Sequence, residues 1–343
     1  FSPMPQPRTM TPAEANDILP WHVPLWQRLH EARRTDRLPH ALLLTGIAGL
    51  GKRRLAEQFA HSLLCERPGP SGSPCGACRG CRLFLAGTHP DVRIIAPSQE
   101  DHSGEIRIDA IRALNEGEAL TAHAGGYKLV ILEPAERMTV SAANSLLKTL
   151  EEPAPGVVMI LITATPQKLP ATIRSRCQRL DLSIPTEKAA LQWLGARAES
   201  ADPLVLLRLA NGAPLRALAL AGSPSLQQRD EAFVEFLALS ERSTNPLLTA
   251  EAWIKLDQRL LLGWLYGWVG DLLRLATGHR DPRLTNPDKR VALQRLAGRL
   301  PARSLHEFLQ QLLRARALVD TTVNPQLLLE SLLIRWVRLA RRP

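Results

Sequence analysis

The sequence predicts an α/β domain with a parallel sheet, followed by a region that is wholly helical. Apolar runs typical of buried strands alternate with amphipathic segments through the first half of the chain, which indicates a sheet covered by helices. From about residue 184 only helical periodicity remains. A third observation is a glycine-rich stretch directly after the first apolar run, which gives the strand, turn and helix order of a phosphate-binding loop.

The predicted strands are apolar without alternation, as expected for strands that are buried on both faces. They are residues 41–44, 91–96, 129–132 and 157–163. Amphipathic helices are expected between them, because apolar residues recur there at helical spacing. These helices are residues 52–64, 108–120 and 141–150, and a shorter helix-like segment follows the fourth strand at residues 169–175.

The second half of the chain is predicted to contain helices alone. Residues 204–210 and 215–221 form two short helices on either side of an Asn-Gly-Ala-Pro turn. Long leucine-rich helices follow from about Gln228, which predicts a helical bundle. Its tryptophans are expected in the core, and they are Trp253, Trp264, Trp268 and Trp336. We therefore expect domains at residues 1–184, 185–226 and 227–343.

The turn after the first strand has the glycine spacing of a phosphate-binding loop but lacks one of its functional groups. Gly46, Gly49 and Gly51 allow backbone N–H groups to approach a phosphate, and Lys52 can reach the terminal phosphates of ATP. The next residue is normally Ser or Thr, whose hydroxyl holds Mg²⁺. Here it is Arg53, a cation without an acceptor atom. A glycine-rich turn that binds no nucleotide is the alternative interpretation.

The acidic element that P-loop ATPases need is altered too. After the third predicted strand such ATPases have Asp, which holds the metal, and then Glu, which orients the attacking water. This chain has Glu133 and Pro134, and proline offers neither a carboxylate nor an N–H. Glu133 can still reach a metal through its longer side chain. Changes in both halves of one site predict that ATP hydrolysis is lost, whereas ATP binding is left open.

Four of the five cysteines are clustered, with the spacing C-x9-C-x2-C-x2-C. They are Cys65, Cys75, Cys78 and Cys81. Four thiolates suit a closed, tetrahedral, structural Zn²⁺ site. An iron–sulfur centre is an alternative, since C-x2-C-x2-C also occurs in ferredoxins, although the Cys-Pro that completes such motifs is missing. We expect zinc, in an insertion at residues 65–81 after the helix of the phosphate-binding loop.

Composition and charge limit the class of protein. At 343 residues, with 45% hydrophobic content, the chain is long enough for two or three packed domains. No apolar run reaches the ~18–20 residues of a membrane span, and residues 1–8 lack the apolar core of a signal peptide. We therefore expect a cytoplasmic protein.

The net charge is +10, with 16 Lys and Arg against 8 Asp and Glu after residue 250. This excess indicates either solvated helix faces or proximity to a polyanion such as DNA.

Three stretches resemble the AAA+ subunits of bacterial DNA polymerase III clamp loaders. They are KLVILEPAERM at 128–138, ANSLLKTLEEP at 143–153 and LPATIRSRCQ at 169–178. The resemblance runs from about Trp21 to Trp336 and includes the cysteine cluster. It implies that the three expected domains are a RecA-like AAA+ domain with a zinc insertion, a small helical lid and a C-terminal helical collar.

Within this family the motor subunit (gamma/tau) has an intact loop and an Asp-Glu pair, whereas another subunit keeps only a Ser-Arg-Cys motif. This chain resembles the second kind, in which the resemblance implies that Arg176 acts as an arginine finger on the ATP of a neighbouring subunit. A structural ion pair is the alternative for Arg176, and Arg174 and Arg179 are nearby. Thr163 and Arg216 match sensor positions of the family and are vestigial if no nucleotide binds.

The resemblance also implies partners. They are motor (gamma/tau) and delta subunits in a five-subunit ring that opens the sliding β clamp and places it on primed DNA. An active motor-type ATPase is an alternative function, and Arg53 and Pro134 argue against it. A zinc-containing nucleic-acid-binding protein is another, but that class explains neither the Ser-Arg-Cys motif nor the phosphate-binding loop. ATP turnover by the isolated chain separates the first two functions.

Overall fold

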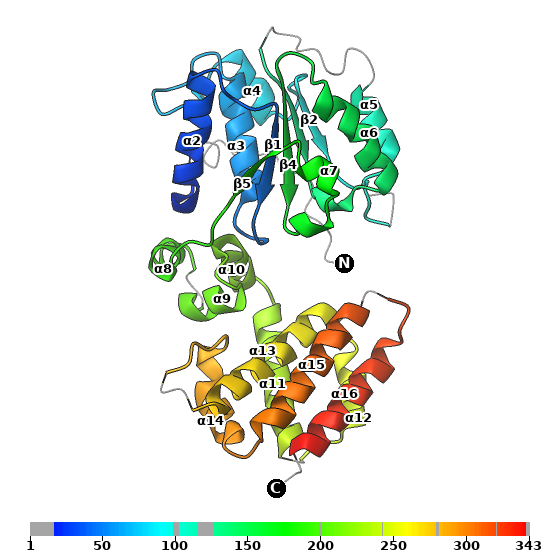
Figure 1. The fold of residues 1–343 in the computed structure, drawn as a ribbon. Coiled ribbons are helices and arrows are strands. Elements are labelled where there is room, and N and C mark those ends of the chain that lie inside the picture. The colour runs from blue at the N-terminus through cyan, green and yellow to red at the C-terminus, as the bar shows by residue number, and fades with distance from the viewer. Residues whose placement is uncertain are drawn as a thin grey trace. The chain divides into compact units, whose positions relative to one another are not determined.

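The chain divides into two compact units, Phe1–Ala189 and Ala190–Pro343, each with a hydrophobic core of its own (Figure 1). The structure is a computed structural model that describes residues 17–98, 103–115, 126–198, 201–241, 243–278, 281–319 and 321–340. The first unit contains a parallel sheet and the second is helical, so the fold class predicted from the sequence is confirmed. The finer division into three domains stays a prediction.

Five parallel strands form the sheet within the described part of the first unit, in the order β2-β3-β4-β1-β5. They are β1 Ala41–Thr45, β2 Val92–Ile95, β3 Lys128–Leu132, β4 Val157–Thr163 and β5 Gln178–Asp181. β1, β3 and β4 are buried along their whole length, as their apolar sequences require. Because all the strands are parallel, the carboxyl ends of β1, β3 and β4 meet at one edge of the sheet.

Helices cover both faces of this sheet (Figure 1). One face carries η1 Pro20–His22, α2 Val23–Arg34, α3 Lys52–Leu64 and α4 Arg79–Leu85. The other face carries α5 Ile108–Asn115, α6 Val140–Glu151 and α7 Ala171–Arg174, with the short turns η3 Ala135–Arg137 and η4 Pro166–Lys168 nearby. On this second face Ile111, Leu146 and Ile173 are fully buried and pack in one cluster with side chains of the strands.

The elements expected around the phosphate-binding loop are present, and their ends agree with the prediction to within a residue or two. The helix expected at residues 108–120 begins at Ile108 and is described as far as Asn115, and residues 116–120 lie outside the described residues. The sequence predicts no strand at β5. Only Leu180 of its four residues is buried, so this edge strand lacks the continuous apolar pattern that marks the others.

Three short helices lie at the start of the second unit. They are α8 Glu187–Gly195, whose first residues belong to the first unit, α9 Pro203–Leu209 and α10 Pro214–Ala221. Asn211 and Gly212 form the turn between α9 and α10 with left-handed φ angles of 55° and 84°, which these two residue types tolerate best.

In the described part of the chain no single helix is long and apolar enough to cross a membrane, although α9 and α10 pass that test together as a pair bent by 116°.

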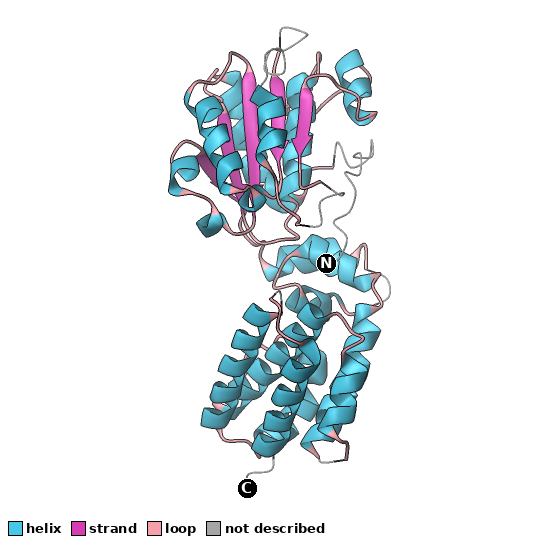
Figure 2. Ribbon diagram, turned by 90° about the vertical axis from the view of Figure 1, so that its right-hand side faces the viewer, coloured by secondary structure: helices cyan, strands magenta, loops and turns pink. Residues whose placement is uncertain are grey.

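A helical bundle makes up the rest of the second unit (Figure 2). It consists of α11 Ser225–Ser240, α12 Pro246–Trp253, α13 Gln258–Ala276, η5 Pro287–Lys289, α14 Arg290–Ala297, α15 Ala302–Leu318 and α16 Pro325–Ala340. Trp253, Trp268 and Trp336 are buried in its core, as predicted, whereas Trp264 packs against the core and is half-buried. Phe236 joins these rings, with centroids 4.5 Å from Trp336 and 5.2 Å from Trp268.

A buried polar network fixes the segment before α14 against the bundle. Asp271 is fully buried in α13 and accepts hydrogen bonds from the backbone N–H groups of Thr285 (2.9 Å) and Asn286 (2.7 Å). Arg229 of α11 is buried as well, and both of its terminal nitrogens lie 3.0 Å from the carboxylate oxygens of Asp288. This two-pronged pair joins elements that are far apart in the sequence.

Candidate functional site

The phosphate-binding loop, Glu133 and Thr163 lie together at the carboxyl edge of the sheet. The loop follows β1, Glu133 follows β3 and Thr163 is the last residue of β4, and β4 pairs with both of the other strands. This is the edge at which open α/β sheets bind their ligands. Arg216, the other expected sensor residue, lies exposed in α10 of the second unit.

The loop keeps a backbone conformation that only glycine tolerates well. Gly46, Gly49 and Gly51 have φ angles of 140°, 87° and 84°, in the region where a Cβ atom is strained. A Cβ on Gly46 would also lie 2.8 Å from the carbonyl oxygen of Leu182. The loop therefore requires its three glycines, as a phosphate cradle would, and phosphate binding by it stays a prediction.

Lys52 does not point freely into this cradle. Its amino group donates hydrogen bonds to the carbonyl oxygens of Gly46 (2.7 Å) and Ile47 (3.0 Å). The side chain is only 7% exposed, and burial lowers the pKa of Lys52 although Glu133 and Glu136 act in the opposite direction. The cation that would hold the terminal phosphates is thus bonded to the loop itself.

Arg53 occupies the position of the missing hydroxyl and is held by two carboxylates. Its Nε lies 2.7 Å from Oε1 of Glu57, one turn further along α3, and its Nη1 lies 3.7 Å from Oε2 of Glu133. Burial raises the pKa of Glu133, while the positive charges of Arg53 and Lys52 lower it. A guanidinium, which has no acceptor atom, therefore stands beside the acidic residue that would otherwise hold a metal.

The residues after Glu133 also have partners within the protein. Glu136, which the sequence analysis did not single out, accepts hydrogen bonds from the backbone N–H of Ala164 (3.3 Å) and the hydroxyl of Thr165 (3.1 Å). The buried Thr163 hydroxyl accepts one from the N–H of Thr165 (3.0 Å). These contacts join the acidic element to the end of β4, and no sequence spacing indicates them.

The Ser-Arg-Cys motif lies just after α7, on the face of the sheet that carries α6. Ile173 and Cys177 are buried on either side of Arg176, which is itself exposed. The Arg176 guanidinium donates to the carbonyl oxygen of Thr172 (3.0 Å) and pairs with Glu151 at the end of α6 (2.5 Å). Burial raises the pKa of the Cys177 thiol to about 11, so this cysteine is a small core residue rather than a reactive thiol.

The two arginines near this motif differ from Arg176. Arg174 is the last residue of α7 and is exposed. Arg179 lies in β5, where its Nε is 2.7 Å from Oδ1 of Asp181 in the same strand. Arg176 alone of the three is joined to another helix by an ion pair that the structure describes.

The four clustered cysteines bring their sulfur atoms to one point between α3 and α4. All four sulfurs lie within 4.8 Å of one another, and those of Cys75 and Cys81 are 3.9 Å apart. A tetrahedral ion with bonds of about 2.3 Å to sulfur separates its ligands by about 3.8 Å. The cluster can therefore hold a metal ion, and the described cysteines form no disulfide.

Backbone N–H groups and helix packing hold the cluster in shape. The N–H groups of Cys75, Cys78 and Cys81 point at the sulfurs of Cys65, Cys75 and Cys78 at 3.2–3.4 Å. Such contacts stabilise thiolates and orient them toward a metal. His61 of α3 stacks on Phe84 of α4, with ring centroids 4.7 Å apart, and thereby fastens the insertion to the helix of the phosphate-binding loop.

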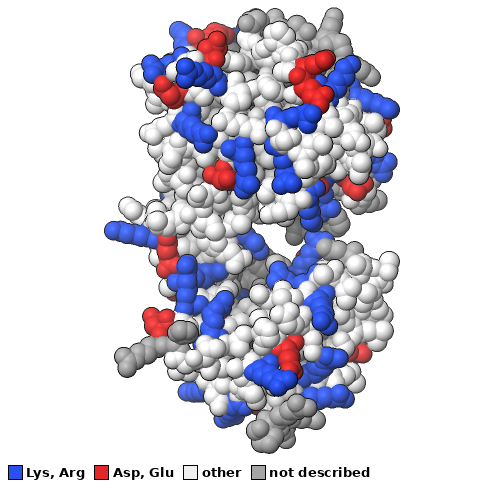
Figure 3. Space-filling model, viewed as in Figure 1, with Lys and Arg blue, Asp and Glu red and all other residues white. Residues whose placement is uncertain are grey.

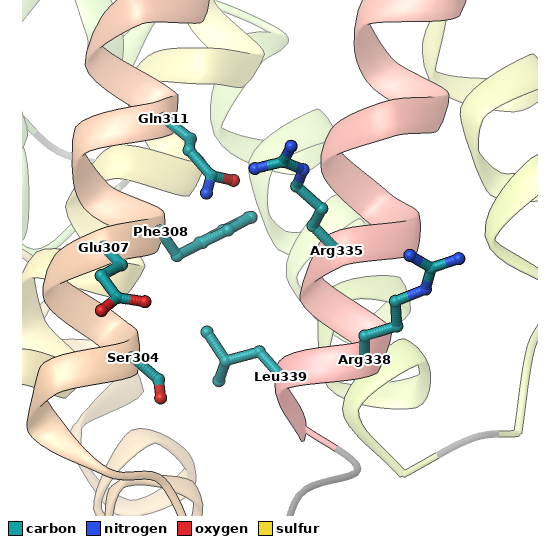
Figure 4. A pocket seen from close by; sticks show the side chains of 7 residues that line it. All are labelled: Ser304, Glu307, Phe308, Gln311, Arg335, Arg338 and Leu339. Carbon is teal, nitrogen blue, oxygen red and sulfur yellow. The ribbon is translucent and has the colours of Figure 1, made fainter.

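The second unit carries a pocket of about 260 Å³ between α15 and α16 (Figure 4). Arg335 of α16 points toward Gln311 of α15 across it, whereas the guanidinium of Arg338 turns away from α15. None of the expected site residues lines this pocket. On the face shown in Figure 3, Lys and Arg are more numerous than Asp and Glu over this unit, in line with its basic composition.

Two family models match the chain. The model described as DNA polymerase III, delta subunit, matches residues 21–186. The model described as DNA polymerase III, delta subunit, C terminal, matches residues 223–338. Together they cover the sheet unit and the helical bundle.

Two known proteins that are similar over almost the whole chain carry the same name. The DNA polymerase III subunit delta′ of Pseudomonas aeruginosa is 40% identical over 332 residues, which are 94% of this chain and 98% of that protein. The subunit delta′ of Escherichia coli K12 is 35% identical over 320 residues, or 92% and 94% of the two chains. Among solved structures, a DNA polymerase III gamma subunit-related protein of Thermotoga maritima aligns with a TM-score of 0.44 and 19% identity, over 91% of this chain and 99% of that one.

Proposed function

The chain belongs to the delta-prime family of DNA polymerase III clamp-loader subunits, and we propose that it serves its complex without hydrolysing ATP. In this proposal it is a fixed member of a five-subunit ring with motor (gamma/tau) and delta subunits. The ring opens the sliding β clamp and places it on primed DNA. The subunit contributes Arg176 to the ATP site of the motor subunit next to it.

The observation that carries the proposal is the ion pairing of Arg53. Hydrolysis needs a Mg²⁺ ion between the phosphates and a carboxylate that orients water. Arg53 lies beside Glu133 and Glu57, where its positive charge opposes a divalent cation, and Pro134 supplies no second carboxylate. The chain thus keeps the frame of an ATPase while its own charges exclude the metal.

Arg176 has the properties that a finger acting on another subunit requires. Negative charge develops on the transferred phosphoryl group, and an arginine delivered from a neighbour typically accelerates the reaction about 10³–10⁵-fold. Arg176 is exposed on a backbone that buried Ile173 and Cys177 hold in place. Since its own site excludes the metal, a catalytic arginine has a use only at the ATP of another subunit.

We further propose that Cys65, Cys75, Cys78 and Cys81 hold a structural Zn²⁺ ion. All four ligands are thiolates, which suits a closed site rather than a catalytic one. Thr163 and Arg216 are then remnants of sensor positions, and Gly46, Gly49, Gly51 and Lys52 bind nucleotide weakly or not at all.

The second unit has two roles in this proposal. The helical bundle is the collar through which the subunit joins the ring, and α8–α10 form the lid of the AAA+ domain.

The first test is ATP turnover by the isolated protein. We expect none above background, because neither the metal ligand nor the carboxylate that positions water is present. Turnover of about 1 s⁻¹, the lower end for ordinary enzymes, that Lys52→Ala abolishes would show instead an active motor-type ATPase.

The second test is Arg176→Ala in a loader reconstituted with motor and delta subunits. We expect clamp- and DNA-stimulated ATPase to fall only in part, because one of several motor sites adjoins this subunit, whereas clamp loading falls by at least about tenfold. Arg176→Lys should rescue poorly, since an ammonium lacks the planar fork that bridges two oxygens. Unchanged loading and turnover, with normal assembly, would show that Arg176 is structural.

A further inference from the structure

Both terminal nitrogens of Arg176 are engaged within its own subunit. Nη2 lies 2.5 Å from Oε1 of Glu151, and Nη1 donates to the carbonyl oxygen of Thr172 at 3.0 Å. A guanidinium needs these same two nitrogens to bridge two oxygens of a phosphate. The side chain cannot make both sets of bonds at once.

The backbone that carries Arg176 is fixed, so a change of partner falls to the side chain. The backbone N–H of Arg176 donates to the carbonyl of Ile173 (3.1 Å), and both Ile173 and Cys177 are buried in the core beneath α6 and α7. Glu151 is the last residue of α6, which packs against α7. The arginine and its carboxylate therefore stand on two elements that the core holds together.

The side chains of Arg176 and Glu151 are 36% and 49% exposed. Ion pairs in such positions contribute little to folding, because water and salt screen both charges. A nucleotide phosphate in a partly desolvated interface carries more negative charge and is the stronger partner. Arg176 can thus exchange Glu151 for a phosphate by rotation of its own side chain, without any unfolding of the backbone.

We propose that Glu151 is a positioning residue that keeps Arg176 turned onto its own subunit until the phosphate of a neighbour's ATP competes for the guanidinium. This inference rests on the proposed function of Arg176 as a finger. Glu151 then sets how close the two subunits must come before Arg176 reaches the neighbouring site. Only at that distance does the guanidinium bind the phosphate more strongly than it binds Glu151. Without the carboxylate, the finger reaches that site more often in the resting complex.

The test is Glu151→Gln in the reconstituted loader, because glutamine keeps the shape of the side chain and removes its charge. We expect ATPase without clamp and DNA to rise about two- to fivefold, which is the range that an exposed ion pair can contribute. With clamp and DNA present the rate should be unchanged, since the finger is already engaged. Glu152→Gln is the matched control: Glu152 is the next residue, is exposed and has no ion pair among the described residues.

The outcomes separate this inference from the function on which it rests. If Arg176→Ala lowers loading while Glu151→Gln leaves the resting rate unchanged or lowers it, the inference is wrong and the finger stands. If Arg176→Ala has no effect, the finger itself is wrong, and the inference falls with it. Thermal unfolding of each isolated variant gives a further reading, because a merely structural role for Glu151 would lower Tm without raising the resting rate.

Discussion

At the scale of single residues, we propose that Arg53 keeps Mg²⁺ out of the candidate nucleotide site. Its guanidinium is tethered to α3 and pairs with Glu57 and Glu133. A Mg²⁺ ion would have to displace this charge and would find no hydroxyl in its place. The residue therefore acts in two ways, since it removes a metal ligand and occupies the carboxylate that remains.

Arg53→Thr should make ATP binding dependent on Mg²⁺. The hydroxyl restores a metal ligand and releases Glu133, so we expect binding at least about tenfold tighter with Mg²⁺ than without it, or about 1.4 kcal/mol. Turnover should stay at background, because Pro134 still supplies no carboxylate. Titration calorimetry of the isolated protein, with Mg²⁺ and with a chelator, measures both affinities.

Arg54→Thr is the control for this change. Arg54 is the next residue of α3, but it pairs with Asp17 at 2.9 Å rather than with the acidic element. Its loss should leave ATP binding weak and insensitive to Mg²⁺, as in the unmodified protein. If Arg53→Thr behaves like Arg54→Thr, the guanidinium is not what excludes the metal.

Much of the candidate site could be predicted from residue types, and its contacts could not. The missing hydroxyl at Arg53 and the missing carboxylate at Pro134 are visible in the sequence. The pairing of Arg53 with Glu57 follows the i, i+4 spacing of one helix, so the sequence alone allows it. The contact of Arg176 with Glu151 joins two segments that are separate in the chain, so only the fold brings them together.

At the scale of elements, the buried cluster in the insertion between α3 and α4 consists of Cys65, Cys78 and Cys81, so we predict that a metal ion holds this insertion in shape. Cys78→Ser should therefore release the metal ion, because an alcohol is a poor substitute for a thiolate ligand of zinc. Backbone amides of residues 65–85 should then exchange at least about tenfold faster, while those of β1, β3 and β4 keep their protection. Elemental analysis and hydrogen exchange measure the two effects.

Cys177→Ser is the control for the metal site. Cys177 lies in the core beneath α7 and is not one of the clustered ligands, so this variant should keep a full equivalent of zinc. Iron, or no metal at all, in the unmodified protein would contradict the zinc assignment whatever the variants show.

Elements with a strong apolar pattern could be predicted, and weakly patterned ones could not. β4 is buried at all seven positions, and its predicted ends agree with the structure. β5 is a strand because its backbone pairs with β1, whereas its own residues are mostly polar and exposed. Pairing with β1 therefore makes β5 a strand, and the residues of β5 alone do not indicate this pairing.

At the scale of the whole molecule, the two units have separate cores. Acid should act on the helical unit through the ion pair between the buried Arg229 and the partly exposed Asp288. Burial would raise the pKa of Asp288, but its hydrogen bond to Arg229 and the positive charge of Arg229 outweigh this and lower the pKa below the ordinary 3.8. A carboxylate whose pKa is lower in the folded state stabilises that state fully above its ordinary pKa. The stabilisation is lost as the pH falls through the lower value.

We therefore expect the free energy of unfolding of the helical unit to fall between about pH 5 and about pH 2. Arg229→Met should lower it by about 1.5–3 kcal/mol near neutral pH, since Asp288 loses both hydrogen bonds from Arg229 and keeps only the 3.4 Å contact with Lys289. It should also weaken the dependence on pH. Urea unfolding followed by tryptophan fluorescence reports mainly on this unit, which holds Trp253, Trp264, Trp268 and Trp336.

Arg290→Met provides the comparison for this measurement. Arg290 pairs with Asp281 at 2.8 Å, but its side chain is 40% exposed and that of Asp281 is 85% exposed, so its loss should change stability by less than about 1 kcal/mol. Equal effects of the two substitutions would show that burial of Arg229 is unimportant.

The change from an α/β pattern to a helical one could be predicted at this scale, whereas the Arg229 network could not, because its partners lie 57 to 59 residues away in the chain.

The pairing of Arg53 with Glu133 also limits how such a chain can evolve. Replacing Arg53 alone leaves Glu133 without its nearest counter-charge, and adding a carboxylate at position 134 alone places a second acid where no metal is bound. Each single step costs up to about 1 kcal/mol before any hydrolysis returns. Under the proposed function, a return to ATP hydrolysis therefore requires substitutions at both positions, and selection acting on one substitution at a time opposes the first of them.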